Sequence, residues 1–237
     1  MATVEELEAQ IKVLEHKLDT VLEDRVAKIE DINAIERLQH MYGYYIDMLL
    51  YDEMTELFTE NGSMEIGQRG RYVGKENIRK FLTDVLGGMS EPGLRKNQVI
   101  NHTQHQGVVT VLPGGERAKG RWRALVQAGS ALTDVADASP EDLAGAMMWA
   151  DGVYENTYVK EEGIWKIEQF WWSPTFYTTL KYDNMWYETT PVSTTFPPQE
   201  DSHPVDEALG RTFVPYHYVH PVTGEVVRPI FLDAEEA

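Results

Sequence analysis

The N-terminal part of the chain places apolar side chains at the spacing of a coiled-coil seam. They recur at alternating intervals of four and three residues, with Glu and Lys around them, at Leu7, Ile11, Leu14, Leu18 and Val21. The pattern lasts for only about three heptads. It predicts a short oligomerisation helix over residues 1–27, joining two or three copies of the chain. A surface helix lying on its own domain is the alternative that the same pattern allows.

A second periodic set predicts a separate helix, with Asp31 as its N-cap and its end near Asp52. Its apolar positions are Ile35, Leu38, Tyr42, Ile46 and Leu49. Residues 52–58 continue as another helix, which the sequence TENG at 59–62 is expected to end.

The middle of the chain changes from helical spacing to strand-like alternation. Residues 62–74 carry Gly at their bends and predict a hairpin, and residues 75–88 predict a short amphipathic helix closed by glycines. Runs of alternating polarity with Gly-containing turns then predict an antiparallel meander over residues 98–112, 118–129, 146–160 and 165–177. Helices followed by a long curved sheet predict an α+β domain over residues 28–180.

The last segment, residues 181–237, is rich in Pro, Thr and aromatic residues and shows little periodicity. It is too aromatic for a disordered linker. We therefore expect an extended arm that packs on this subunit or on a neighbour.

The composition excludes several classes of function. A formal net charge of −18 argues against binding to nucleic acid or to an anionic membrane surface, because both require Lys and Arg patches. The chain has no Cys, which excludes disulfides, thiolate nucleophiles and Cys-based metal sites. The acidic N-terminus lacks the layout of a signal peptide, and no apolar run is long enough for a membrane span. The cytoplasm is the expected location.

A family resemblance is carried by five segments, in chain order: IEDINAIERLQHMYGYYIDMLLYDEMTELFTENGSMEI, YVGKENIRKFL, NHTQHQGVVTV, ERAKGRWRAL and GVYENTYVKEEGIWKIEQF. Together they resemble the SnoaL-like branch of the nuclear transport factor 2-like superfamily, which includes scytalone dehydratase, hexachlorocyclohexane dehydrochlorinase and the ketosteroid isomerases. The resemblance covers about residues 28–175. It implies a cone, in which a strongly bent antiparallel sheet wraps around helices and leaves a deep pocket at its open end.

The same resemblance implies a catalytic pair. Lyase members of the family eliminate a leaving group without metal or organic cofactor, using a His base that an Asp orients. The Asp falls on Asp47 and the His on His102. Pocket-lining positions fall on Tyr42, Ala124, Val126, Gly152, Tyr154 and Trp172. The sequence departs from the pattern at Phe170, where the dehydrochlorinase has a pocket arginine, so a cation that could stabilise a leaving anion is missing there.

Each member of the pair has a plainer interpretation when taken alone. A carboxylate on the flank of a helix is usually solvated, and a lone strand His more often makes a structural hydrogen bond. As partners, Asp47 would fix the tautomer of His102 and stabilise the imidazolium formed when the ring takes a proton. His105 is the alternative base if a β-bulge at Gly107 shifts the register. The spacing His102-x-x-His105 on a strand puts the two rings on opposite faces, so no metal site is expected.

Aromatic residues concentrate in the second half of the chain and favour a slot for an aromatic small molecule. One of the adjacent tryptophans in FWWSP should face the interior of the cone. Trp122 is a further candidate contact, and Tyr44 is a candidate hydroxyl donor. We therefore expect a cofactor-independent lyase with the His–Asp pair as base and Tyr42 or Tyr154 as the acid.

The long chain, the aromatic strand and the C-terminal arm also resemble the lignin-dimer lyases of sphingomonad bacteria. Those enzymes take a diarylpropane diol, lose the benzylic hydroxyl to give a quinone methide, and expel the terminal carbon as formaldehyde, leaving a stilbene. This resemblance implies a lignin-derived diarylpropane diol as substrate. A dehydratase or isomerase of a polyketide- or steroid-like ring is one alternative, and a non-catalytic ligand-binding module is another.

Overall fold

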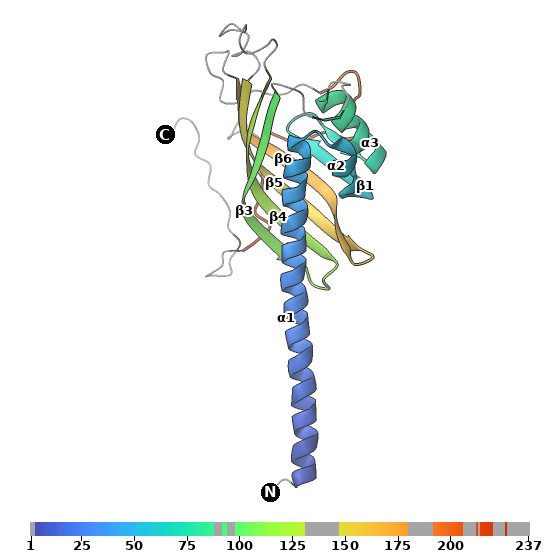
Figure 1. Ribbon diagram of the computed structural model, residues 1–237, viewed down its shortest axis with the longest axis vertical. Coiled ribbons are helices and arrows are strands. Elements are labelled where there is room, and N and C mark those ends of the chain that lie inside the picture. Colours follow the sequence, from blue (N-terminus) through green and yellow to red (C-terminus); the bar gives the residue numbers. More distant parts are fainter. Residues whose placement is uncertain are drawn as a thin grey trace, which may run out of the picture.

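A long N-terminal helix and a curved sheet form the two main layers of the protein, which we describe from a computed structural model (Figure 1). The structure describes residues 3–87, 92–93, 98–130, 147–179, 192–205, 212, 214–219 and 226. Residues 180–191, where the predicted arm begins, lie outside this part of the chain.

Helix α1 (Val4–Asp47) is one continuous helix of 44 residues, so the prediction of two separate helices is wrong. It begins with a capping box at Thr3. Asp31 is not an N-cap, because it lies within the helix. Its carboxylate accepts a hydrogen bond from Nε1 of Trp165 (2.8 Å) and lies 2.6 Å from Nζ of Lys160. Asp31 therefore fastens the helix to the sheet.

The N-terminal part of α1 projects away from the sheet (Figure 1). Residues 3–30 are all exposed, and they include the apolar seam formed by Leu7, Ile11, Leu14, Leu18 and Val21. Nothing in the described part of the chain covers this seam. The charged residues around it make α1 too polar to cross a membrane, and no other described helix is long and apolar enough to do so.

Two short helices and a hairpin follow α1. These elements are α2 (Tyr51–Glu56), β1 (Phe58–Ile66), β2 (Arg71–Val73), α3 (Lys75–Lys80) and the π-helical segment η1 (Phe81–Leu86). The hairpin of β1 and β2 is confirmed. The sequence TENG does not end a helix, because β1 has already begun at Phe58 and contains it.

In the described part of the chain, six strands form one curved sheet in the order β2-β1-β6-β5-β4-β3. The long strands are β3 (Gln98–Val111), β4 (Arg117–Ser130), β5 (Met147–Glu161) and β6 (Ile164–Thr179). Each of these pairs antiparallel with the next, which confirms the predicted meander. Strand β1 joins parallel to β6, so the sheet is mixed. The predicted α+β cone fold is thereby confirmed.

The C-terminal half of α1 packs against the sheet through a stripe of buried side chains. Ile35, Tyr42 and Ile46 belong to the core. The ring of Tyr42 lies 4.5 Å from that of Phe170 and 6.0 Å from that of Tyr154, between ring centres. Full burial of one large apolar side chain contributes about 1.5–3 kcal/mol, so this stripe fixes how the last turns of α1 sit on the sheet.

A buried polar network joins the same two layers. Gln39 accepts hydrogen bonds at Oε1 from the hydroxyl of Tyr158 (2.8 Å) and from Nδ2 of Asn156 (2.9 Å). Its own Nε2 donates to Oε1 of Gln104 (2.9 Å), and Nε1 of Trp122 donates to the Tyr158 oxygen (3.0 Å). Because buried polar groups are costly when unpaired, the network specifies one position of the helix along the strands.

The described parts of the C-terminal arm pack on this same subunit. Glu200 forms a β-bridge with Arg71, next to the edge strand β2. The ring of His203 stacks on Trp171 with 3.6 Å between centres, and its Nδ1 lies 2.8 Å from the buried carboxylate of Glu65. These contacts hold this stretch of the arm against β1, β2 and β6.

Candidate active site

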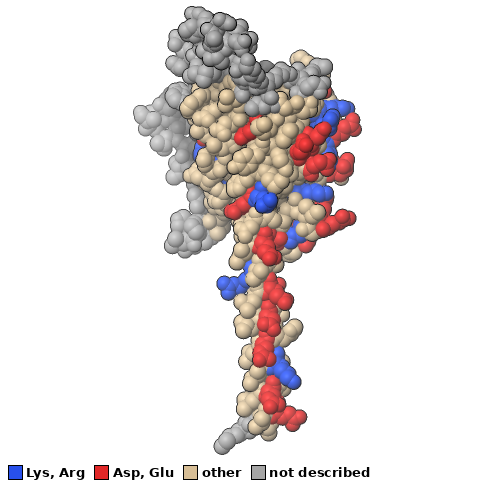
Figure 2. All heavy atoms as spheres, in the orientation of Figure 1, with Lys and Arg blue, Asp and Glu red and all other residues tan. Residues whose placement is uncertain are grey.

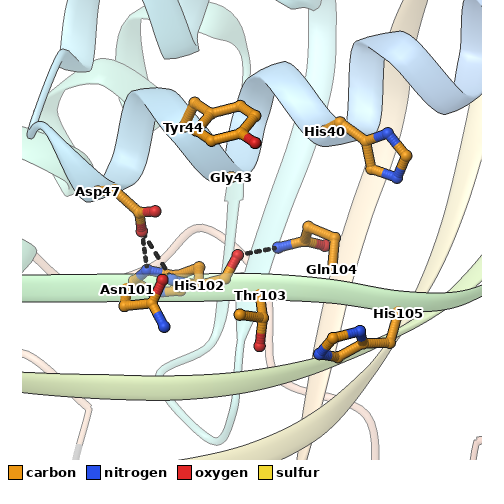
Figure 3. Close-up of a pocket in the computed structure, with 9 residues that line it drawn as sticks. All are labelled: His40, Gly43, Tyr44, Asp47, Asn101, His102, Thr103, Gln104 and His105. Carbon is orange, nitrogen blue, oxygen red and sulfur yellow. Dashed lines mark hydrogen bonds and ion pairs between the residues drawn. The ribbon is translucent and has the colours of Figure 1, made fainter.

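Asp47 and His102 meet where the end of α1 runs alongside β3 (Figure 3). One carboxylate oxygen, Oδ1 of Asp47, accepts the backbone N–H of His102 at 2.7 Å and lies 3.0 Å from Nδ1 of the ring. Both side chains are largely buried, with exposed fractions of 20% for Asp47 and 16% for His102. With Nδ1 held by the carboxylate, Nε2 is the ring nitrogen that can exchange a proton with a bound molecule.

Gly43 allows the two elements to approach closely enough for this contact. A Cβ at this position would lie 3.1 Å from Cγ of Gln104 and 3.2 Å from the carbonyl oxygen of His102. Asp47 follows one helical turn later on the same side of α1 and so reaches the strand. The helix ends there, and Leu49 turns the chain with a left-handed φ of 54°.

A cavity of about 180 Å³ lies on the inner side of His102. Its walls come from the end of α1, from the sheet and from the turn after β1, and most of them are apolar. The sequence-predicted residues that it brings together are His102, Tyr42, Tyr154, Val126 and Trp172. A dry cavity of about 150 Å³ can hold benzene, so the cavity suits an aryl ring.

Two buried tyrosines supply the hydroxyl groups predicted for the site. Burial, followed by the neighbouring Tyr154, raises the pKa of Tyr42 well above its ordinary value. Burial likewise raises the pKa of Tyr154, although hydrogen bonding to Gln104 and Tyr42 opposes part of this rise. Both hydroxyls therefore stay protonated at neutral pH and can donate a hydrogen bond or a proton.

Gly152 contributes by making room for the Trp172 ring. A Cβ on Gly152 would lie 2.5 Å from Nε1 and Cε2 of Trp172, closer than any ordinary contact. The glycine itself does not line the cavity among the described residues. Its predicted role as a substrate contact is thus replaced by one in shaping the wall.

Tyr44 and His105 lie in a different recess, of about 350 Å³, between the outer side of α1 and β3 (Figure 3). Tyr44 is 72% exposed there. A bulge does interrupt β3, but it begins after His105, between that residue and Val108, so it does not turn the ring into the cavity. Asp47 and His102 also border this recess, which gives the pair access to water on that side.

Trp122 and Ala124 are buried, but the structure does not place them on the cavity wall. Trp122 packs edge-on against His40, with 5.7 Å between ring centres, and donates to Tyr158. Ala124 pairs with Gln104 and Gly152 in neighbouring strands. Both residues serve the packing between α1 and the sheet.

Three polar residues of the cavity escape the sequence analysis: Arg69, Tyr51 and Tyr177. Arg69 lies in the turn between β1 and β2, where the glycines of GQRG are the only hint that a side chain could be presented. Phe170, at the position where a cation was expected to be missing, is fully buried against Tyr42 and Tyr154. The cavity nevertheless contains a cation, supplied by a different element.

No group of three or more His, Asp or Glu residues in the described ranges is close enough to hold a metal ion. On the surface, acidic side chains line the projecting half of α1 and gather over α2 and α3 (Figure 2).

A comparison with protein families identifies the class of protein. Residues 27–170 match the SnoaL-like domain family. The match spans more than half of the chain and coincides with the helix end and the curved sheet. The chain belongs to the SnoaL-like family, in the nuclear transport factor 2-like superfamily. A comparison with curated proteins finds no match to it.

Solved structures share this fold at low sequence identity. A candidate scytalone dehydratase from Novosphingobium aromaticivorans is 20% identical, with a TM-score of 0.52 over 71% of this chain and 99% of that chain. A type 2 hexachlorocyclohexane dehydrochlorinase is 15% identical, with a TM-score of 0.53 over 70% of this chain and 98% of that chain. The type 3 hexachlorocyclohexane dehydrochlorinase from Novosphingobium barchaimii is 13% identical, with a TM-score of 0.52 over 70% of this chain and 99% of that chain.

Proposed function

We propose that the protein is a cofactor-independent lyase that acts on an aromatic small molecule. The observation that carries the proposal is the Asp47–His102 pair at the wall of a cavity lined by rings and tyrosine hydroxyls. The names of two similar proteins, a dehydratase and a dehydrochlorinase, describe eliminations and support the same reaction class.

In this proposal a histidine acts as the base and a tyrosine acts as the acid. His102 takes a proton at Nε2 while Asp47 stabilises the imidazolium that forms. Tyr42 or Tyr154 donates a proton to the departing oxygen. A positioned acid or base of this kind typically contributes about 10²–10⁴-fold in rate.

The substrate we favour is a lignin-derived diarylpropane diol with a free para-phenol. The phenol loses its proton, the benzylic C–O bond breaks, and the tyrosine proton leaves with the hydroxyl as water, giving a quinone methide. His102 then removes the proton of the terminal hydroxyl, the terminal C–C bond breaks, and formaldehyde departs. Those electrons restore the aromatic ring and leave a stilbene. The phenol is its own electron sink, so the sequence of steps needs no metal or organic cofactor.

A second candidate is favoured by the volume of the cavity. About 180 Å³ suits one ring, which favours a simpler dehydratase or isomerase that acts on a single ring of a polyketide- or steroid-like compound. The same His and Asp would serve that reaction. Formaldehyde is released only in the first reaction, so its detection separates the two.

The test is a panel of phenolic monomers and dimers, first for thermal stabilisation and then for turnover. Stilbene absorbance and a colorimetric formaldehyde reagent follow the favoured reaction. His102→Ala should remove at least about 10²-fold of the rate. His105→Ala is the matched control, because it deletes an exposed imidazole on the same strand. Equal turnover by both variants would contradict the acid–base account and leave a ligand-binding module as the better interpretation.

We also propose that the chain is a homo-oligomer held by the seam of α1. Five apolar seam positions on a projecting helix are exposed in one subunit, and heptad spacing is complementary to a second copy of itself. The seam lies on the projecting half of α1, whereas Tyr42 and Ile46 in the other half line the cavity, so separate variants can test assembly and chemistry.

A further inference from the structure

We propose that Arg69 binds an ionised oxygen of the substrate, so that the site selects aromatic compounds that carry a phenolate. This inference rests on the proposed function, because it names the substrate class for the same cavity.

The first support is the position of Arg69. It lies in the short turn between β1 and β2 and lines the cavity together with Trp172 and Tyr177. Its guanidinium carbon lies 5.9 Å from the centre of the Tyr177 ring. His102 lines the same cavity from β3, so a ligand between them can touch a cation and the base at once.

The second support is that the charge of Arg69 is not compensated. A guanidinium has five N–H donors, and among the described residues this one makes a single hydrogen bond, from Nη1 to the carbonyl oxygen of Ile66 at 3.3 Å. No carboxylate in the described part of the chain lies within ion-pair distance of it. Other arginines of the sheet and α3 do have acidic partners: Arg71, Arg79, Arg117, Arg121 and Arg123.

The absence of a carboxylate beside Arg69 is notable because acidic side chains outnumber basic ones in this chain, 39 to 21. An arginine that faces an apolar cavity without an acidic partner has donors available for an anionic ligand. An anion there would also gain from the low local polarity, which strengthens a charge-assisted hydrogen bond.

The chemistry of the proposed reaction explains why the anion is a phenolate. Loss of the benzylic hydroxyl needs electrons pushed from the para oxygen, and the ionised phenol pushes them much better than the neutral one. Arg69 favours that ionised form on binding, with the phenol proton released to solvent. The benzylic C–O bond then breaks with a proton from a tyrosine, and the para oxygen becomes the carbonyl of the quinone methide.

The experiment compares two probes of nearly the same shape. Para-nitrophenol ionises near neutral pH and reports its ionisation by absorbance, whereas para-nitroanisole is its methyl ether and cannot ionise. Dissociation constants for both are measured across the neutral pH range. The variants are Arg69→Gln, Arg69→Lys and, as a charge-matched control on the exposed outer side of β4, Lys119→Gln.

We expect the unmodified protein to bind ionised para-nitrophenol roughly ten- to a hundredfold more tightly than para-nitroanisole, the range typical of hydrogen bonds to charged groups. The absorbance midpoint of the bound phenol should move to lower pH. Arg69→Gln should abolish both effects while para-nitroanisole still binds, Arg69→Lys should restore part of them, and Lys119→Gln should leave them unchanged.

Equal affinity of the unmodified protein for the two probes, with no movement of the midpoint, would overturn the role of Arg69 and leave the aromatic cavity intact. That result needs no variant, so it holds even if Arg69→Gln folds poorly. Failure of both probes to bind would instead contradict the aromatic cavity, and with it the proposed function and this inference together.

Discussion

One carboxylate oxygen of Asp47 holds His102 at two points, through the backbone N–H at 2.7 Å and the ring Nδ1 at 3.0 Å. The last residue of α1 is thus joined to the edge strand β3 at the position where the proposed base lies. The same acid fixes the strand and orients the ring. Variants of Asp47 must therefore separate a structural from a chemical contribution.

Asp47→Asn separates them. The amide oxygen can still accept the backbone N–H, whereas the charge that would stabilise an imidazolium is gone. We expect kcat/KM on a turned-over substrate to fall by about 10²–10⁴-fold with little change in the melting temperature. Asp47→Ala should lose stability as well, by about 1–3 kcal/mol, because the buried N–H loses its partner.

Steady-state kinetics and urea unfolding measure the two effects side by side. Asp52→Asn is the matched control, since this carboxylate lies just beyond α1 in an exposed pair with Arg79. Undiminished turnover in Asp47→Asn would contradict a catalytic role for the carboxylate.

The tyrosine acid can be identified by removing single hydroxyls. We expect either Tyr42→Phe or Tyr154→Phe to lower kcat by about 10²–10⁴-fold with a small effect on substrate affinity, because the hydroxyl acts only as the oxygen departs. Tyr158→Phe is the control, since this hydroxyl is equally buried but bonds to Gln39, Asn156 and Trp122 away from the cavity. Comparable kcat in all three variants would mean that water or another group protonates the leaving oxygen.

The same tyrosines make the fold sensitive to alkaline pH. Burial raises the pKa of Tyr42, Tyr154 and Tyr158 above its value of about 10 in an unfolded chain. Below this pH the three hydroxyls are protonated in both states and stability is unaffected. Above it the unfolded chain releases protons that the folded one keeps, so the free energy of unfolding falls, by up to about 4 kcal/mol per pH unit for three groups.

Urea unfolding at a series of alkaline pH values measures this slope. Each buried Tyr→Phe variant should reduce it by about 1.4 kcal/mol per pH unit. Tyr44→Phe is the comparison variant, because it removes a tyrosine hydroxyl from a side chain that is 72% exposed. A slope that does not respond to the buried variants would mean that other groups control alkaline unfolding.

Local patterns account for most of the fold that could be predicted from the sequence. Alternating polarity with Gly at the turns identifies β3 to β6, since strand period and turn chemistry are both local properties. The break predicted near Asp31 fails because a polar residue that suits a cap also suits a contact across the structure, here with Trp165 and Lys160. Local sequence cannot distinguish these two uses of a carboxylate.

In the candidate site, too, some residues could be predicted from the sequence and others depend on contacts between distant parts of the chain. Asp47 and His102 were placed by family resemblance, and the structure brings their side chains together. Arg69 was missed because a side chain on a two-strand turn has no periodicity that assigns it a direction. Gly152 was taken for a ligand contact, whereas its missing Cβ serves a tryptophan on the neighbouring strand.

The seam of α1 gives the last prediction. Its apolar side chains are about half exposed in the single subunit, for example Leu14 at 63% and Leu18 at 59%. Burying them against another copy recovers hydrophobic free energy, and heptad spacing aligns the two seams. We therefore expect sedimentation to report a dimer or trimer, and the double variant Leu14→Glu, Leu18→Glu to be monomeric.

Val13→Glu provides the matched control, because Val13 is also exposed, at 54%, but lies outside the seam, about 130° around the helix from it. Leu and Glu have similar helix propensity, so the double variant should keep the helical content of α1 and lose only the partner. Monomeric behaviour of the unmodified chain would contradict the proposed homo-oligomer. Loss of assembly in Val13→Glu but not in the double variant would place the interface on another face of the helix.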